Sequence, residues 1–177
     1  MDKDEIERAR DPRYHFQGFD PDFLIGLGRL LLGSSYLEGS ASILLARLID
    51  NDDSDGLALG RRLTANAAFP WLLDHIRAVS ELKLPSSHHV QIVAWVKRAD
   101  AAYVRRSRIV HAGLGVDATG DEIRFIFLRH NARAKTFQSD VWPARASEIH
   151  QLAALLEAIG LEAVDLMGLI PKADRGV

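Results

Sequence analysis

The amino-acid sequence predicts a mainly α-helical bundle of five to six helices, with a small β-hairpin inserted before the last helix. Apolar residues recur at helical spacing along most of the chain, and the period changes to two between residues 122 and 142. Clusters of glycine, proline and acidic residues separate these segments. A chain of 177 residues, of which 47% are hydrophobic and 26% charged, has the size and composition of one globular domain.

The first predicted helix covers residues 22–49, where leucine and isoleucine form apolar stripes. Each glycine inside a helix costs about 1 kcal/mol relative to alanine. Small residues also let two helices approach closely, so residues 33–35 and 39–42 are candidate packing notches. A break of the helix near Gly33 is the alternative.

Three further helices follow in the middle of the chain. A short one covers residues 57–63, and a second begins at Pro70 and continues to Leu82. The longest covers residues 88–112, and Gly113 stands where a glycine is expected to end it.

The alternating segments 122–128 and 135–142 predict the two strands of the hairpin, and residues 129–134 connect them. After Pro143 a final helix covers residues 144–166. Its inward side chains are expected to be Ile149, Leu152, Leu156 and Ile159.

The sequence divides into a polar N-terminal arm (residues 1–20), a helical domain (21–168) and a C-terminal tail (169–177). The start of the chain lacks the apolar core of a signal peptide. The most apolar stretch, residues 23–37, is shorter than the roughly twenty residues that span a bilayer. We therefore expect a cytoplasmic protein without a membrane segment.

Several chemistries are excluded by composition and motif. The chain has no Cys, which excludes thiol catalysis, disulfides and thiolate metal sites. Its net charge of −2 provides no overall attraction to nucleic acid, so any RNA contact must come from a local basic cluster. No phosphate-binding loop or dinucleotide fingerprint occurs, and no metal site or cofactor is expected.

The densest basic cluster is Arg105-Arg106-Ser107-Arg108, which leads directly to His111. Histidine transfers protons near neutral pH. Arginine binds phosphate through paired hydrogen bonds and stabilises charge that develops on it. Together these groups suffice for RNA cleavage without a metal, in which a 2′-hydroxyl attacks the adjacent phosphate.

Helix geometry separates the two central residues of this cluster. Arg106 and His111 are five positions apart, which places them about 140° apart around an ideal helix. Two such helix ends facing each other across a two-fold axis would combine residues from both chains in one cleft.

The segment from Arg106 to His111 resembles the Arg-x4-6-His motif of the HEPN superfamily of helical ribonucleases and toxins. The order of helices over residues 22–166 is also similar. The resemblance implies a homodimer with a composite cleft and metal-independent endoribonuclease activity on RNA. It gives catalytic roles to Arg106 and His111, with Arg105, Ser107 and Arg108 in support, and suggests a toxin–antitoxin or other defence system with a cognate antitoxin or regulatory partner.

A second interpretation belongs to a different functional class. Many proteins with this fold are non-catalytic modules for dimerisation or for binding a nucleotide or other ligand, in which the arginines form a solvated or partner-facing surface. Arginine and histidine near a helix C-terminus also stabilise the helix dipole. Glu38 is a candidate partner for an arginine of the cluster, and Trp95 and Tyr103 are either base-stacking residues or core.

Overall fold

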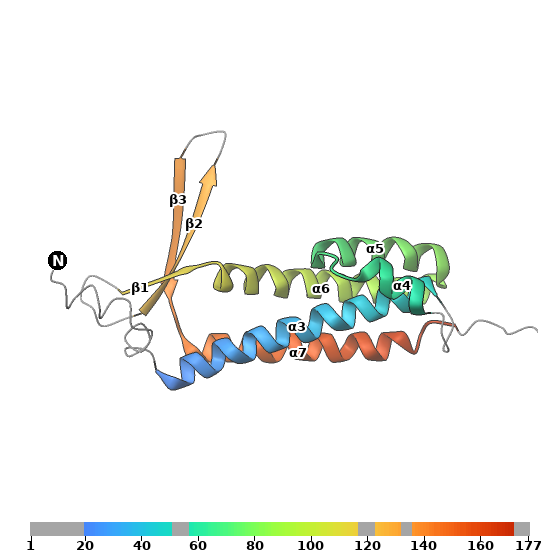
Figure 1. Ribbon diagram of the computed structural model, residues 1–177, viewed down its shortest axis with the longest axis horizontal. Coiled ribbons are helices and arrows are strands. Elements are labelled where there is room, and N and C mark those ends of the chain that lie inside the picture. The colour runs from blue at the N-terminus through green and yellow to red at the C-terminus, as the bar shows by residue number, and fades with distance from the viewer. Residues whose placement is uncertain (1–19, 51–56, 117–122, 132–135, 172–177) are drawn as a thin grey trace, which may run out of the picture.

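The computed structural model describes residues 20–50, 57–116, 123–131 and 136–171. These ranges form five helices and a three-stranded antiparallel sheet that precedes the last helix, which confirms the mainly helical class (Figure 1). The elements are α3 (Pro21–Ile49), α4 (Leu57–Thr64), α5 (Phe69–Lys83), α6 (Ser86–Val110), β1 (Gly113–Val116), β2 (Ile123–Asn131), β3 (Thr136–Pro143) and α7 (Ala146–Met167).

Helix α3 is continuous and pairs with α7. The Asp20 carboxylate caps its first turn by accepting a hydrogen bond from the Asp22 N–H at 3.0 Å. No break occurs at Gly33, which is buried against α7. A Cβ at Gly33 would lie 3.0 Å from the Ala153 carbonyl oxygen, so the predicted packing notch exists at this position. At residues 39–42, Ser40 and Ala41 are buried, whereas Gly39 faces open space.

Helix α4 also approaches α3 through a glycine. A Cβ on Gly60 would lie 2.7 Å from the Ala46 Cα and 2.8 Å from its carbonyl oxygen. The Gly60 N–H donates to the Asp50 carboxylate at 2.6 Å. The two helix backbones are therefore in direct contact, and only glycine fits here.

Helix α6 runs antiparallel to α3 and α7, and its N-terminal half packs under α5 (Figure 1). Trp95 is fully buried, and its indole Nε1 donates to the Ile159 carbonyl of α7 at 2.9 Å. The four side chains expected to face inward from α7 are all buried, which confirms that prediction. The largest fully buried side chains come from α3, α5, α6 and α7: Leu30, Leu37, Leu44, Leu45, Leu48, Ile76, Ile92, Trp95, Ile149, Leu152 and Leu156.

The sheet is larger than the predicted hairpin. Gly113 does not end α6, which stops at Val110; it is the first residue of β1, which pairs with β2. Strand β2 continues to Asn131, within the stretch expected to be a turn. Strands β2 and β3 project from the helical body, at the end opposite α4 and α5 (Figure 1).

The base of the sheet is anchored in the helical core. Phe125 is 2% exposed, and its ring centroid lies 6.0 Å from that of Phe23 on α3 and 5.5 Å from that of Trp142. Phe125 and Trp142 are also register partners in the β2–β3 pair. This anchoring places Trp142 beside the last turns of α6.

Several expectations fall on residues that are not described. The expected N-terminal arm, apart from Asp20, lies outside the described residues, as does most of the expected tail. No helix in the described part of the chain combines the length and the apolar character needed to cross a bilayer.

Candidate functional site

The C-terminal end of α6 carries the basic cluster. Helix α6 ends at Val110. The next residue is His111, whose N–H donates to the Ser107 carbonyl at 3.0 Å. The chain then turns directly into β1. The His111 side chain is exposed, and within the described ranges its imidazole makes no hydrogen bond or ion pair. His111 is therefore accessible at an open helix end.

Arg106 points toward α3. Its Nε donates to the Ser34 hydroxyl at 3.1 Å, and Ser34, which is 1% exposed, donates in turn to the Leu30 carbonyl at 2.6 Å. The guanidinium carbon lies 5.3 Å from the Tyr103 ring centroid, in the range of a cation–π contact. The half-buried guanidinium is thus held in a fixed position by its own chain.

Glu38 completes this contact between α3 and α6. The Glu38 carboxylate acts electrostatically on the Tyr103 hydroxyl, and the Tyr103 ring packs against Phe69 at a centroid distance of 4.4 Å. Burial raises the pKa of Tyr103, the negative charge of Glu38 raises it further, and the positive charge of Arg106 acts in the opposite direction. Glu38 was expected to pair with an arginine of the cluster. Its charge instead acts on Tyr103, and Arg106 lies over the Tyr103 ring.

Arg108 and Arg105 point away from Arg106. The Arg108 Nη2 lies 3.1 Å from the Asp140 carboxylate oxygen of β3, and its guanidinium carbon lies 5.1 Å from the Trp142 ring centroid. Arg105 is exposed beside α7, and Ser107 is half-buried. The three arginines therefore lie against three different elements.

A pocket of about 170 Å³ opens where α6, α7 and β3 meet. Three apolar side chains, two cationic groups and one acidic group line it, from the residues Arg105, Arg108, Ile109, Trp142, Glu148 and Leu152. Trp142 was not singled out from the sequence as a site residue. Trp95, which was, is fully buried in the core, and Tyr103 is half-buried against Phe69.

A larger groove of about 620 Å³ lies between α3 and α7. Its lining is apolar except for one cation and one anion, and consists of Arg29, Leu32, Gly33, Tyr36, Glu157 and Leu161. Nothing in the sequence spacing alone had indicated a groove here, because α3 and α7 are at opposite ends of the chain.

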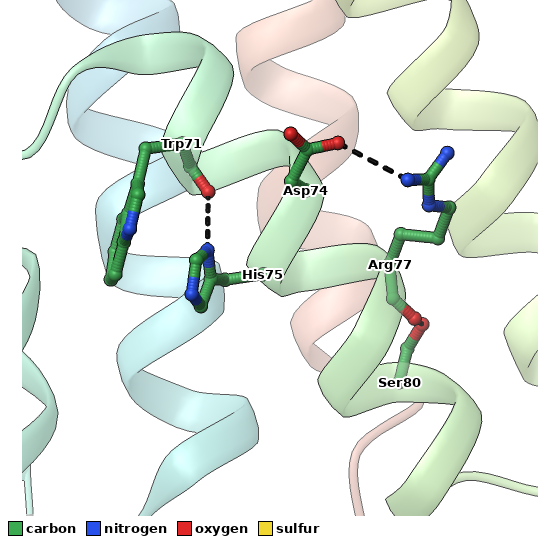
Figure 2. Close-up of polar contacts among 5 residues, drawn as sticks. All are labelled: Trp71, Asp74, His75, Arg77 and Ser80. Atoms are coloured by element: carbon green, nitrogen blue, oxygen red, sulfur yellow. Dashed lines mark hydrogen bonds and ion pairs between the residues drawn. The ribbon is translucent and has the colours of Figure 1, made fainter.

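Helix α5 carries a separate polar cluster, shown in Figure 2. The His75 Nδ1 donates to the Trp71 carbonyl at 2.8 Å, and the two rings stack at a centroid distance of 3.7 Å. Arg77 pairs with Asp74 at 3.2 Å, and both side chains are mostly exposed. These residues provide exposed histidine and arginine controls away from the C-terminal end of α6.

Among the residues that the structure describes, no three His, Asp or Glu side chains gather as metal ligands would. Comparisons of the chain with protein-family models, with curated proteins and with solved structures find no match.

Proposed function

We propose that the C-terminal end of α6 is the active site of a HEPN-like, metal-independent endoribonuclease in the cytoplasm. The observation that supports this most is the exposed His111 imidazole at an open helix end, with three arginines in the two turns before it. A toxin or effector of a defence or stress system, held in check by a partner protein, is the biological role that this activity would serve.

The reaction is a transesterification of RNA. A histidine removes the proton from the 2′-hydroxyl, whose oxygen attacks the adjacent phosphorus, and a protonated histidine donates a proton to the 5′-oxygen that leaves. The products are a 2′,3′-cyclic phosphate and a 5′-hydroxyl. Arginine stabilises the charge that develops on the phosphate oxygens in the transition state.

The site is assembled from two chains in this proposal. Arg106 faces α3 within its own chain, and His111 lies about 140° away around the helix. One chain therefore keeps the two groups apart. Two copies that face each other through their α6 ends would supply a histidine base, a histidine acid and several guanidinium groups to one phosphate.

The test is incubation of the protein with mixed-sequence RNA in EDTA. Wild-type protein should cleave RNA and leave 2′,3′-cyclic phosphate ends, and His111→Ala should not. His75→Ala, which removes an exposed histidine from α5, should cleave like wild type. Cleavage by His111→Ala at the wild-type rate contradicts the proposed mechanism.

Arg106 needs a separate control because it also binds Ser34. Arg106→Ala removes both the charge and this hydrogen bond, whereas Ser34→Ala removes only the bond. If Arg106 stabilises the transition state, Arg106→Ala loses most of the cleavage and Ser34→Ala retains most of it. Equal losses in both variants would assign Arg106 a positioning role.

One observation favours the second functional class, a non-catalytic dimerisation module. Helix α3 exposes four large apolar side chains on one face: Ile25 (57% exposed), Leu32 (73%), Tyr36 (41%) and Ile43 (45%). With Arg29 and Gly39 they form a stripe whose spacing alternates four and three residues, the pattern of a helix–helix seam. The groove between α3 and α7 runs beside this stripe.

A second copy of the chain fits this α3 stripe. The spacing is the same in both directions, so two stripes can pair antiparallel. Ile25 then lies opposite Ile43 and Leu32 opposite Tyr36. Gly39 faces open space and leaves room for Arg29 of the other copy.

The dimer through the α6 ends and the dimer through the α3 stripe place the two α6 ends differently. Ile25 and Ile43 are each nine residues from Ser34, which places them about 180° around α3 from the face that meets Arg106. A dimer through the α3 stripe therefore holds the two copies of His111 on opposite outer faces. It would not form the composite cleft.

Sedimentation of Leu32→Glu separates the two arrangements. If the α3 stripe forms the dimer, Leu32→Glu sediments as a monomer, whereas Leu82→Glu on α5, where Leu82 is 85% exposed, sediments like wild type. A dimer that survives Leu32→Glu contradicts the α3 arrangement. A wild-type protein that is monomeric at every concentration tested contradicts both arrangements.

A further inference from the structure

The pocket between α6, α7 and β3 lies next to the end of α6 that carries His111. Arg108 is part of both the pocket and the proposed cleavage site, because it lines the pocket and lies about 60° around α6 from His111. Besides its arginines, the pocket contains an aromatic ring and a carboxylate, which the cleavage reaction does not use. These groups indicate which part of an RNA chain the pocket binds.

Trp142 gives the pocket a flat apolar wall. Its position is fixed by pairing with Phe125, which is almost fully buried, and by the neighbouring guanidinium of Arg108 at 5.1 Å from its ring centroid. Arg108 is itself held by Asp140. A planar ring and a planar guanidinium, both held in place, are the surfaces on which nucleobases stack.

The charges set the orientation of a ligand. Arg105 is an exposed residue of the pocket lining and makes no ion pair with any other described residue, so it is available to a phosphate. Glu148 lies in the lining, and its carboxylate repels a phosphate. The anionic part of the ligand therefore lies toward Arg105, and a neutral part lies toward Glu148.

Glu148 also selects among neutral groups. A carboxylate accepts hydrogen bonds from the exocyclic amino groups of cytosine, adenine and guanine, whereas uracil offers only a ring N3–H between two carbonyl oxygens that repel the carboxylate. The Glu148 carboxylate is about half-exposed, and its contact with Arg145 at 3.4 Å leaves acceptor capacity free. The pocket of about 170 Å³ is smaller than the roughly 300–1,000 Å³ of sites for drug-sized ligands, which fits one ring system.

We propose that this pocket binds one amino-bearing base of a single-stranded RNA, stacked at Trp142 and Arg108, with the neighbouring phosphate on Arg105. The inference rests on the proposed function, because it supplies a base-binding subsite to the cleavage site at His111. It adds a preference for cytosine, adenine or guanine over uracil at one position of the substrate.

Binding is tested apart from cleavage with fluorescently labelled deoxycytidine and deoxythymidine 12-mers in EDTA. Neither oligomer has a 2′-hydroxyl, so neither is cleaved, and thymine lacks an amino group as uracil does. Wild-type protein should bind the deoxycytidine oligomer several-fold more tightly than the deoxythymidine oligomer. Loss of one base stack costs about 5- to 150-fold in affinity, so Trp142→Ala should weaken binding of the deoxycytidine oligomer within this range.

Two further variants separate base recognition from charge. Glu148→Ala removes the acceptor at a half-exposed surface position and should abolish the preference for deoxycytidine. Arg105→Ala should lower the affinity for both oligomers by the same factor and reduce the salt dependence of binding. Trp71→Ala, which removes a partly exposed tryptophan on α5, should bind like wild type (Figure 2).

Three results overturn the inference. The first is equal binding of the two oligomers by wild-type protein. The second is a Glu148→Ala protein that keeps the wild-type preference, and this result stands even if Trp142→Ala fails to fold. The third is competition by inorganic polyphosphate as effective as by the deoxycytidine oligomer. If the protein never cleaves RNA but prefers deoxycytidine and loses this preference in Glu148→Ala, the subsite is retained and only the nuclease proposal is refuted.

Discussion

The hydrogen bond between Arg106 and Ser34 predicts a measurable coupling between α6 and α3. The Arg106 Nε lies 3.1 Å from the Ser34 hydroxyl, which is buried. Hydrogen bonds to charged groups contribute about 1.5–3 kcal/mol to stability. Because Arg106 is only half-buried, water reduces this contribution, and we expect a coupling energy of about 1 kcal/mol.

A double-mutant cycle measures this coupling. Wild type, Arg106→Ala, Ser34→Ala and the double variant are unfolded in urea and followed by circular dichroism, and the free energies of unfolding are compared. The bond from Ser34 to the Leu30 carbonyl is lost in both variants that lack the hydroxyl, so it cancels from the coupling energy. The single change Arg106→Ala should lower the melting temperature by about 2–4 °C for each kcal/mol lost.

Asp74 and Arg77 provide the matched control. They form an ion pair of similar length, 3.2 Å, but their side chains are 70% and 57% exposed (Figure 2). Exposed pairs at this helical spacing contribute about 0.3–0.5 kcal/mol. A coupling between Arg106 and Ser34 no larger than the coupling in this surface pair would show that the bond contributes nothing to the attachment of α6 to α3.

Three further outcomes follow from the packing. Gly60→Ala should lower the free energy of unfolding, measured in urea, by about 1–3 kcal/mol, because its Cβ would meet the Ala46 backbone at 2.7 Å. Gly28 faces open space, so Gly28→Ala should raise the free energy of unfolding by up to about 1 kcal/mol. The pKa of Tyr103 is raised in the folded state, so the stability that its protonated hydroxyl contributes is complete below pH 10 and is lost as the pH rises through that pKa. In urea titrations between pH 10 and 12, Tyr103→Phe should therefore lose less stability than wild type. Trp95→Phe, which leaves a void and removes the hydrogen bond to α7, should cost about 1–3 kcal/mol in the same assay, and a cost below 0.5 kcal/mol would contradict the described core.

The helices were predictable from the sequence because their signals are local. Asp20 and Pro21 mark the start of α3, and Pro70 marks the first turn of α5. The buried stripe of α7 follows from helical spacing alone. These features act within a few residues of chain, so the sequence contains most of the information that decides them.

The strand β1 was not predictable in the same way. The segment Gly113–Val116 is short and half glycine, and its strand conformation depends on pairing with β2. Glycine has little intrinsic preference for a strand. The same glycine is a plausible helix stop, and the partner strand, rather than the local sequence, determines the result.

The candidate site was predictable only in part, for a geometric reason. Successive residues on a helix differ by about 100° in direction, so neighbours in sequence diverge in space. Arg105 lies beside α7, Arg106 faces Ser34 on α3, and Arg108 meets Asp140 and Trp142 on β3. The sequence located the basic helix end, and the neighbouring elements determine what each arginine can bind.

The residues that do converge come from separate parts of the chain. Trp142 follows Arg108 by thirty-four positions and reaches it because Phe125 anchors the base of the sheet in the helical core. A substrate that binds at the end of α6 must therefore contact the sheet and α7 as well as the motif. If the proposed subsite is correct, the effects of Trp142→Ala and Arg105→Ala on oligonucleotide affinity should be less than additive, because a base that loses its stack also loses the position of its phosphate.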